Sequence, residues 1–236
     1  MGGRVLIQIT PQMRILVAIR CYVSSERSSS VSPMLKKLDW KKDLKYLYDA
    51  PKDKVSEVDV PPMNYLMVNG KGDPNTSQEY REAVEALFST AYAVKFALKK
   101  SGGADYSVMP LEGLWWPDGN TPFVPGNKQG WLWTALIAQP PMVTPQLLQT
   151  VLDQVKKKSL PALARLRFES LTEGKSVQIL HVGPYSAEGP TIAGLNQYVR
   201  ESGYQLSGKH HEIYLNAPDR TAAEKLKTII RQPVRR

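Results

Sequence analysis

Three residues with acid–base or aromatic side chains share one face of a predicted strand near the C-terminus. They are His210, Glu212 and Tyr214, spaced by two within the segment 210–215. Successive side chains of a strand point to opposite faces, so residues two apart lie side by side. A carboxyl group among apolar rings has a raised pKa, which suits a general base. The spacing indicates either acid–base chemistry on a small molecule or cation binding through the carboxylate and the ring faces.

The remaining residues of this strand predict where the site points. Ile213 and Leu215 are apolar, and we expect them to pack against a helix. Glu212 then lies on the face that the helices leave uncovered. There it would orient and deprotonate a water molecule, while Tyr185 or His210 donates a proton to the oxygen that gains charge. We therefore take Glu212 and Tyr185 as the candidate catalytic residues.

A second set of acidic and aromatic residues occurs about a hundred residues earlier. Glu112 precedes Pro117-Asp118 by five residues, much as Glu212 precedes Pro218-Asp219 by six. If the two halves are related by a pseudo-twofold axis, the strand faces that carry these glutamates meet across one cleft. That cleft would hold one or two carboxylates among indole rings that stack on a flat aromatic ligand, and the sequence leaves open whether both glutamates face it. The candidate ligand-binding residues are Glu112, Trp116, Trp131, Trp133, His210, Tyr214 and Tyr65.

Several nearby residues have simpler explanations. His181 alternates with apolar residues and is expected in the core, Glu188 is expected to begin a helix, and Trp115 is expected to face the core if Trp116 faces the cleft. The pair His210 and His211 resembles a metal site, but adjacent strand residues point to opposite faces and no third ligand is near. We expect neither a metal nor a cofactor.

The elements that position these residues occur twice in the same order. The first repeat spans about 56–140, a linking helix about 144–158, and the second repeat about 174–234. This pattern predicts an α+β fold: a pseudo-twofold duplicated β-α-β-β module with antiparallel sheets and a ligand cleft between its halves. The expected elements are strand 58–68, helix from 73, strands 106–116 and 131–138, strand 175–182, helix 191–201, and strands 210–215 and 226–231.

Composition narrows the possible partners. The net charge is +9, but lysine and arginine are scattered, and the densest runs are short, as at 156–158. We expect no direct nucleic-acid binding. Residues 1–33 carry four arginines and one acid, and their apolar stretch is broken by Pro11, Arg14 and Arg20. That pattern fits neither a membrane span nor a signal peptide. We expect residues 1–33 to be a doubtful N-terminal extension, either disordered or a misassigned start, with the real protein beginning at Met34. We expect that protein to be cytoplasmic.

Several separated motifs resemble one family, the GyrI-like small-molecule-binding proteins, and in particular its stand-alone branch. The resemblance extends from about Met34 to the C-terminus. It rests on segments 36–42 (KKLDWKK), 111–116 (LEGLWW), 178–185 (QILHVGPY) with the following Glu188, and 210–215 (HHEIYL). It implies a duplicated, SHS2-like β-α-β-β fold with an acidic residue at the Glu212 position facing the cleft. The partner implied is a small aromatic ligand.

The same resemblance leaves three functions open. Some stand-alone members hydrolyse strained cyclopropane rings of DNA-alkylating compounds, and this reaction detoxifies those compounds. Related domains in transcription regulators bind cationic aromatic drugs, and other members inhibit gyrase. No segment upstream of the domain resembles a helix-turn-helix, which weakens the regulator hypothesis. We expect hydrolysis with Glu212 as base; the alternatives are a non-catalytic binder or sensor and a gyrase inhibitor.

Overall fold

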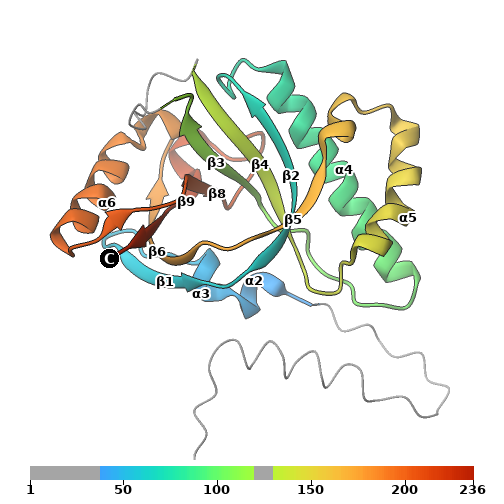
Figure 1. The fold of residues 1–236 in the computed structure, drawn as a ribbon, viewed down its shortest axis with the longest axis horizontal. Coiled ribbons are helices and arrows are strands. Elements are labelled where there is room, and N and C mark those ends of the chain that lie inside the picture. The colour runs from blue at the N-terminus through green and yellow to red at the C-terminus, as the bar shows by residue number, and fades with distance from the viewer. Residues whose placement is uncertain (1–37, 120–129) are drawn as a thin grey trace, which may run out of the picture. The chain divides into compact units, whose positions relative to one another are not determined.

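One antiparallel sheet organises the chain. The computed structural model describes residues 38–119 and 130–236, so the expected extension 1–33 lies outside the described residues. Within these ranges the sheet has nine strands, in the order β1-β6-β9-β8-β3-β4-β2-β5, with β7 paired to β9 (Figure 1). The strands are β1 (Ser56–Val60), β2 (Met63–Lys71), β3 (Leu111–Pro117), β4 (Trp131–Gln139), β5 (Arg167–Leu171), β6 (Gly174–Val182), β7 (Gln205–Leu206), β8 (His210–Tyr214) and β9 (Lys227–Arg235).

The strand order is symmetric about the central pair β3 and β8. Outward from this pair, β4 corresponds to β9, β2 to β6 and β5 to β1. Strands β1 and β2 follow each other in sequence, yet β1 pairs with β6 of the other half, and β5 likewise pairs with β2. Each half therefore completes the sheet of the other. The strand expected over 58–68 is two strands, because Pro61-Pro62 separates β1 from β2.

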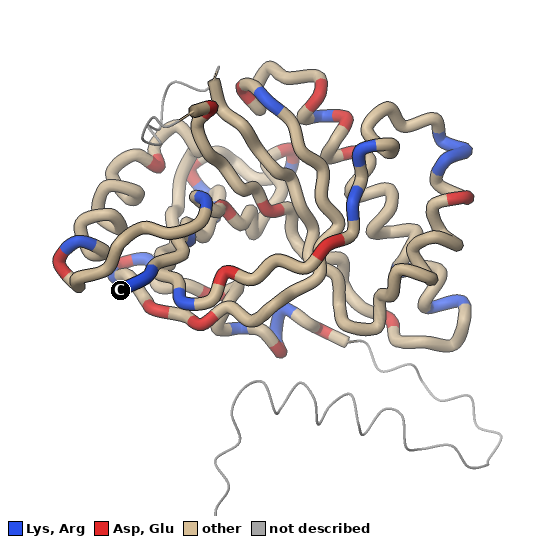
Figure 2. The backbone as a smooth tube through the Cα atoms, viewed as in Figure 1, with Lys and Arg blue, Asp and Glu red and all other residues tan. Residues whose placement is uncertain are grey.

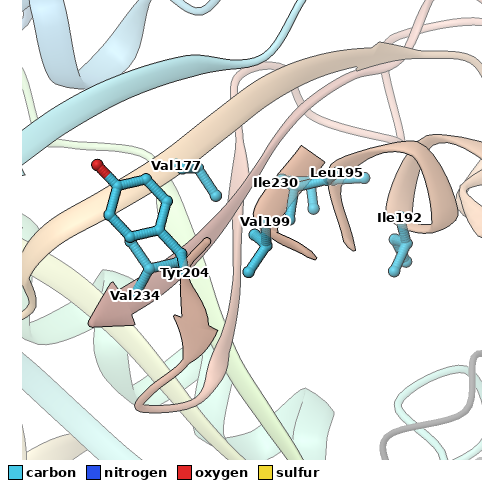
Figure 3. Packing of buried hydrophobic residues seen from close by; sticks show 7 residues of the cluster. All are labelled: Val177, Ile192, Leu195, Val199, Tyr204, Ile230 and Val234. Atoms are coloured by element: carbon cyan, nitrogen blue, oxygen red, sulfur yellow. The ribbon is translucent and has the colours of Figure 1, made fainter. Parts of the chain in front are cut away.

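Two long helices cover one face of the sheet, which we call the helix face. Helix α4 (Gln78–Lys100) begins at Ser77, whose side chain accepts a hydrogen bond from the Tyr80 amide, and it packs on β2 and β4. Helix α6 (Gly189–Glu201) buries Ile192, Leu195 and Val199 against Val177, Ile230 and Val234 of the sheet (Figure 3). The two helices thus occupy the two halves of one face (Figure 1).

Short helices cover the other face, which we call the opposite face. Helices α2 (Trp40–Asp43) and α3 (Lys45–Tyr48) bury Leu44 and Leu47, and the Leu47 carbonyl accepts a hydrogen bond from Arg231 of β9. Helix α5 (Pro145–Val155) and the 3₁₀ turn η1 (Lys156–Lys158) lie beside α4. No helix in the described ranges is long and apolar enough to span a membrane. The other 3₁₀ turns are η2 (Pro161–Arg165), η3 (Tyr185–Ala187) and η4 (Ala223–Lys225).

We predict that Gly70→Ala destabilises the fold. Gly70 pairs with Trp133 on β4, and a Cβ atom at Gly70 would collide with the Trp133 indole, which is fully buried and has no space to move. Overpacking of this kind costs about 1–3 kcal/mol, measurable by urea denaturation. Gly194→Ala is the matched control, because its Cβ would meet nothing and a helical alanine gains up to about 1 kcal/mol. An unchanged stability of Gly70→Ala would contradict the packing described here.

Candidate functional site

Glu212 lies on the helix face, close to the centre of the sheet. Its side chain accepts a hydrogen bond from the Tyr214 hydroxyl at 2.8 Å, and its other oxygen lies 3.2 Å from Nε2 of His210. The residue is only 7% exposed. Strand alternation thus places His210, Glu212 and Tyr214 together, as predicted. A carboxylate held by a phenol and an imidazole has its oxygens oriented, which is a requirement for a general base.

Aromatic residues from the beginnings of both long helices surround this carboxylate. The Tyr185 ring, just before α6, lies edge-on to Tyr214 with centroids 5.5 Å apart. Tyr80, in the first turn of α4, packs on Trp133 and Trp115 with centroids 5.0 and 5.8 Å apart. The pseudo-twofold arrangement of the helices therefore brings two tyrosines to one carboxylate.

The protonation of these phenols follows from burial and from the carboxylates. Burial, together with the charges of Glu188 and Glu212, raises the pKa of Tyr185 to about 12. Burial and the Glu212 charge also raise the pKa values of Tyr80 and Tyr214. All three hydroxyls keep their protons at neutral pH and act as hydrogen-bond donors.

Indole rings form the third part of the site. Trp131 lies with its centroid 5.6 Å from that of Trp115, and the strand pairing of Trp115 with Trp133 places all three on the helix face. The Nε1 atoms of Trp115 and Trp133 are buried without a hydrogen-bond partner. Gly113 makes room for Trp115, because a Cβ there would lie 2.6 Å from the indole Nε1. Since a buried donor without an acceptor is costly, these indoles are suited to donate to a ligand oxygen.

One expectation about strand faces was wrong. Ile213 does not pack under the long helices, because Glu212 is the residue of β8 that shares their face. The register also separates the two glutamates: Glu212 pairs with Gly113, and Glu112 pairs with Ile213, so the glutamates point to opposite faces. Glu112 and Glu212 do not share a cavity.

Two other candidate ligand-binding residues also lie away from Glu212. Tyr65 pairs with Ala138, which places it on the opposite face, and its hydroxyl lies 3.8 Å from the Met63 sulfur. Trp116 also lies on the opposite face, where the Lys209 ammonium is 3.3 Å from its ring centroid. The predicted residues that the structure brings together are Glu212, Tyr185, His210, Tyr214, Trp131 and Trp133.

Glu112 belongs to a buried ionic network on the opposite face. His211 Nε2 lies 2.9 Å from Glu112, and His211 Nδ1 lies 3.0 Å from Glu173 in the turn between β5 and β6. Tyr48 of α3 donates to Glu112 at 2.8 Å, and Arg231 of β9 reaches Glu173 at 3.4 Å. Each ring nitrogen of His211 therefore faces a carboxylate, which requires the imidazolium form.

The ion pairs of this network outweigh the cost of burial. Burial alone lowers the pKa of His211, but Glu173 and Glu112 raise it to about 9. Burial alone raises the pKa of Glu173, but His211 and Arg231 lower it to about 2. We call these four side chains, with Tyr48, the ionic network. It joins β3, β8, β9, the β5–β6 turn and α3 at one point.

Residues 53–235 match the model of the GyrI-like small molecule binding domain. The chain belongs to the GyrI-like family. A hydrolase from Listeria innocua is 38% identical, with a TM-score of 0.73 over 84% of this chain and 100% of that chain. An uncharacterized conserved protein from Listeria innocua is 39% identical, with a TM-score of 0.77 over the same shares. No curated protein matches the chain. The resemblance seen in the sequence motifs and the predicted α+β fold are confirmed.

Three residues of this GyrI-like domain lie near the site although they were not among the predicted site residues. Glu188 begins α6 as expected, but it is buried and its charge acts on Tyr185 and Tyr214. Its position three residues after Tyr185 in the family motif was the available signal. Trp115 is buried, as expected, and its ring packs on Tyr80 beside the site. Tyr80 had no sequence signal because it lies on a helix far from the motifs.

In residues 38–119 and 130–236, no group of three or more His, Cys, Asp or Glu side chains could hold a metal ion. Basic and acidic positions are spread over many elements of the described backbone, with one short basic run at Lys156–Lys158 (Figure 2). The site therefore offers a carboxylate, phenols and indoles to a ligand.

We predict that the ring of His211 titrates well above the ordinary histidine pKa. The protein has three histidines, so ring resonances followed by NMR can be assigned with His→Gln variants. One ring should titrate near pH 9, and it should disappear in His211→Gln. Titration of the His211 ring at or below the ordinary pKa of about 6.5 would contradict the ionic network.

The same raised pKa predicts how stability depends on pH. A group whose pKa is higher in the folded state stabilises fully below its unfolded pKa of 6.5, and that stabilisation is lost as the pH rises through about 9. A shift of this size corresponds to ~3 kcal/mol of unfolding free energy. In Glu173→Gln, urea denaturation should show a smaller loss of stability between pH 6.5 and 9 than in the unmodified protein. An equal loss in both would assign it to other groups.

Proposed function

We propose that this GyrI-like domain hydrolyses strained, electrophilic aromatic compounds that bear a cyclopropane ring, with Glu212 as the general base. The observation that carries the proposal is a buried carboxylate, oriented by two hydrogen-bonding side chains, beside tyrosine hydroxyls and unpaired indole N–H groups. The match to a protein described as a hydrolase supports the same reaction class.

The reaction needs few groups because ring strain supplies much of the driving force. A water oxygen attacks a ring carbon, one strained C–C bond breaks, and its electron pair passes through the conjugated system to a carbonyl oxygen. Glu212 accepts the proton that the water loses. The carbonyl oxygen becomes a phenolate and then takes up one proton, so the sum is the addition of one water molecule.

The surrounding donors would stabilise the charge that develops on the ligand oxygen. Tyr185, protonated because its pKa is about 12, donates a hydrogen bond to that oxygen. The Trp115 N–H is a second donor that is already desolvated and needs no reorganisation. Trp131 and Tyr80 offer ring faces to a flat substrate. The base thus acts on the attacking water, and the donors act on the carbonyl oxygen that receives the electron pair.

We predict that Glu212→Gln abolishes turnover. A cyclopropane-bearing DNA alkylator is incubated with sub-stoichiometric protein, and the water-added product is counted by mass spectrometry. The unmodified protein should give many products per chain, and loss of the base should lower kcat by about 10²–10⁴-fold. The matched control is Glu224→Gln, at an exposed position, which should leave kcat unchanged. Consumption capped near one equivalent, without hydrated product, would replace the hydrolase by a binding module.

We predict a smaller effect for Tyr185→Phe. This variant keeps the ring packing on Tyr214 but removes the donor, so kcat should fall by about 10–10³-fold with little change in KM. A rise in KM at unchanged kcat would instead give Tyr185 a role in binding alone.

A further inference from the structure

Helix α4 carries a row of three aromatic rings on the side away from the sheet, of which the first is half-buried and the other two are exposed. Tyr92 is 47% and Phe96 is 59% exposed, and Phe88 lies one turn earlier. Ring centroids are 6.4 Å apart between Phe88 and Tyr92, and 6.3 Å apart between Tyr92 and Phe96. We call these three residues the aromatic stripe. Contiguous exposed rings of this kind mark interaction surfaces.

The sequence around the stripe is symmetric about Tyr92, with inverted charge. Phe88 and Phe96 lie four residues before and after Tyr92, and Glu85 and Lys99 lie seven residues before and after it. Helix positions four and seven residues apart share one side, so all five side chains follow one line along α4. Glu85 and Lys99 are both exposed.

We propose that this chain forms a homodimer in which two α4 helices pack antiparallel through their aromatic stripes, about a twofold axis at Tyr92. A twofold contact brings the same surface of both chains together, so that surface must be complementary to itself. This line of five residues meets that condition. Tyr92 meets the partner's Tyr92, Phe88 meets the partner's Phe96, and Glu85 meets the partner's Lys99. The contact therefore matches ring to ring and acid to base along the whole line.

The charge of the whole helix supports an antiparallel partner of the same sequence. The first half of α4 holds three glutamates and one arginine, and its last two turns hold three lysines and no acid (Figure 2). An antiparallel copy places each acidic half beside a basic half. Lys99 lies 2.9 Å from Asp105 of its own chain, and Asp105 also lies 3.6 Å from Lys95. In the dimer, the partner's Glu85 would therefore share Lys99 with Asp105.

A groove beside the stripe has room for the partner's rings. It has a volume of about 730 Å³, lies between α4 and α5, and is lined by the stripe together with Gln154, Lys100 and Lys158. Its charged side chains are both cationic, which fits the acidic half of the partner's α4. Tyr80, at the beginning of α4, faces the sheet instead, so a dimer of this form leaves the Glu212 site uncovered.

Sedimentation equilibrium tests the proposal first. The unmodified protein should be dimeric at micromolar concentration, and Tyr92→Ser and Phe96→Ser should each raise the dissociation constant at least tenfold. Leu206→Ser is the matched control, because Leu206 is a comparably exposed apolar residue outside the stripe. Since all three positions are exposed, their melting temperatures should stay close to that of the unmodified protein. A monomer at every concentration, or a dimer insensitive to both stripe variants, would overturn the proposal.

Charge exchange tests the antiparallel register. Glu85→Lys and Lys99→Glu should each weaken the dimer at low salt, because each places like charges opposite each other. An equimolar mixture of the two variants should form a heterodimer, since the lysine introduced in one chain then faces the glutamate introduced in the other. At the other end of this heterodimer, the unchanged Glu85 and Lys99 meet as in the original dimer. The double variant should likewise regain dimerisation. If mixing and the double exchange both fail to restore association, the proposed register is wrong.

Discussion

The ionic network under the centre of the sheet is the interaction on which the rest of the fold depends. Burying an imidazolium, a guanidinium and two carboxylates costs several kcal/mol per ion unless their geometry is complementary. Here His211 lies between Glu112 and Glu173, and Arg231 closes the set, so each charge faces an opposite one. The network holds β3 against β8, where the two halves meet. It thereby fixes the register of the central strand pair.

That register also determines where the chemistry lies. A slip of one residue would turn every side chain of β8 to the other face. In the observed register, His211 points into the network, so its neighbour Glu212 points between the beginnings of α4 and α6, opposite Gly113. The sheet thus separates two kinds of carboxylate. Glu112 and Glu173 are neutralised by cations and hold the structure, whereas Glu212 is bound by a phenol and an imidazole and faces the aromatic site.

The sequence motifs were sufficient for the family, the fold class and the grouping of His210, Glu212 and Tyr214, because strand alternation is a local rule. They were insufficient for the choice of face. Helices cover both faces, so β8 is buried on both sides and its pattern does not distinguish them. For a related reason, the sequence left open whether Glu112 and Glu212 share a cavity. Their distances to the following Pro-Asp turn are five and six residues, and one residue of difference inverts the face.

Tyr80 and Trp115 show which part of a site a sequence leaves hidden. Neither belongs to a recognisable motif of chemistry, and each reaches Glu212 only through tertiary packing: Tyr80 from a helix that follows β2, and Trp115 by leaning over the glycine paired with Glu212. An unpaired buried indole N–H costs about 1–3 kcal/mol. The ionic network stabilises the sheet from its opposite face, and the fold therefore tolerates that cost. In the proposed reaction, a ligand oxygen would accept a hydrogen bond from this indole N–H, and the cost of burying the donor would then be recovered as affinity for the ligand.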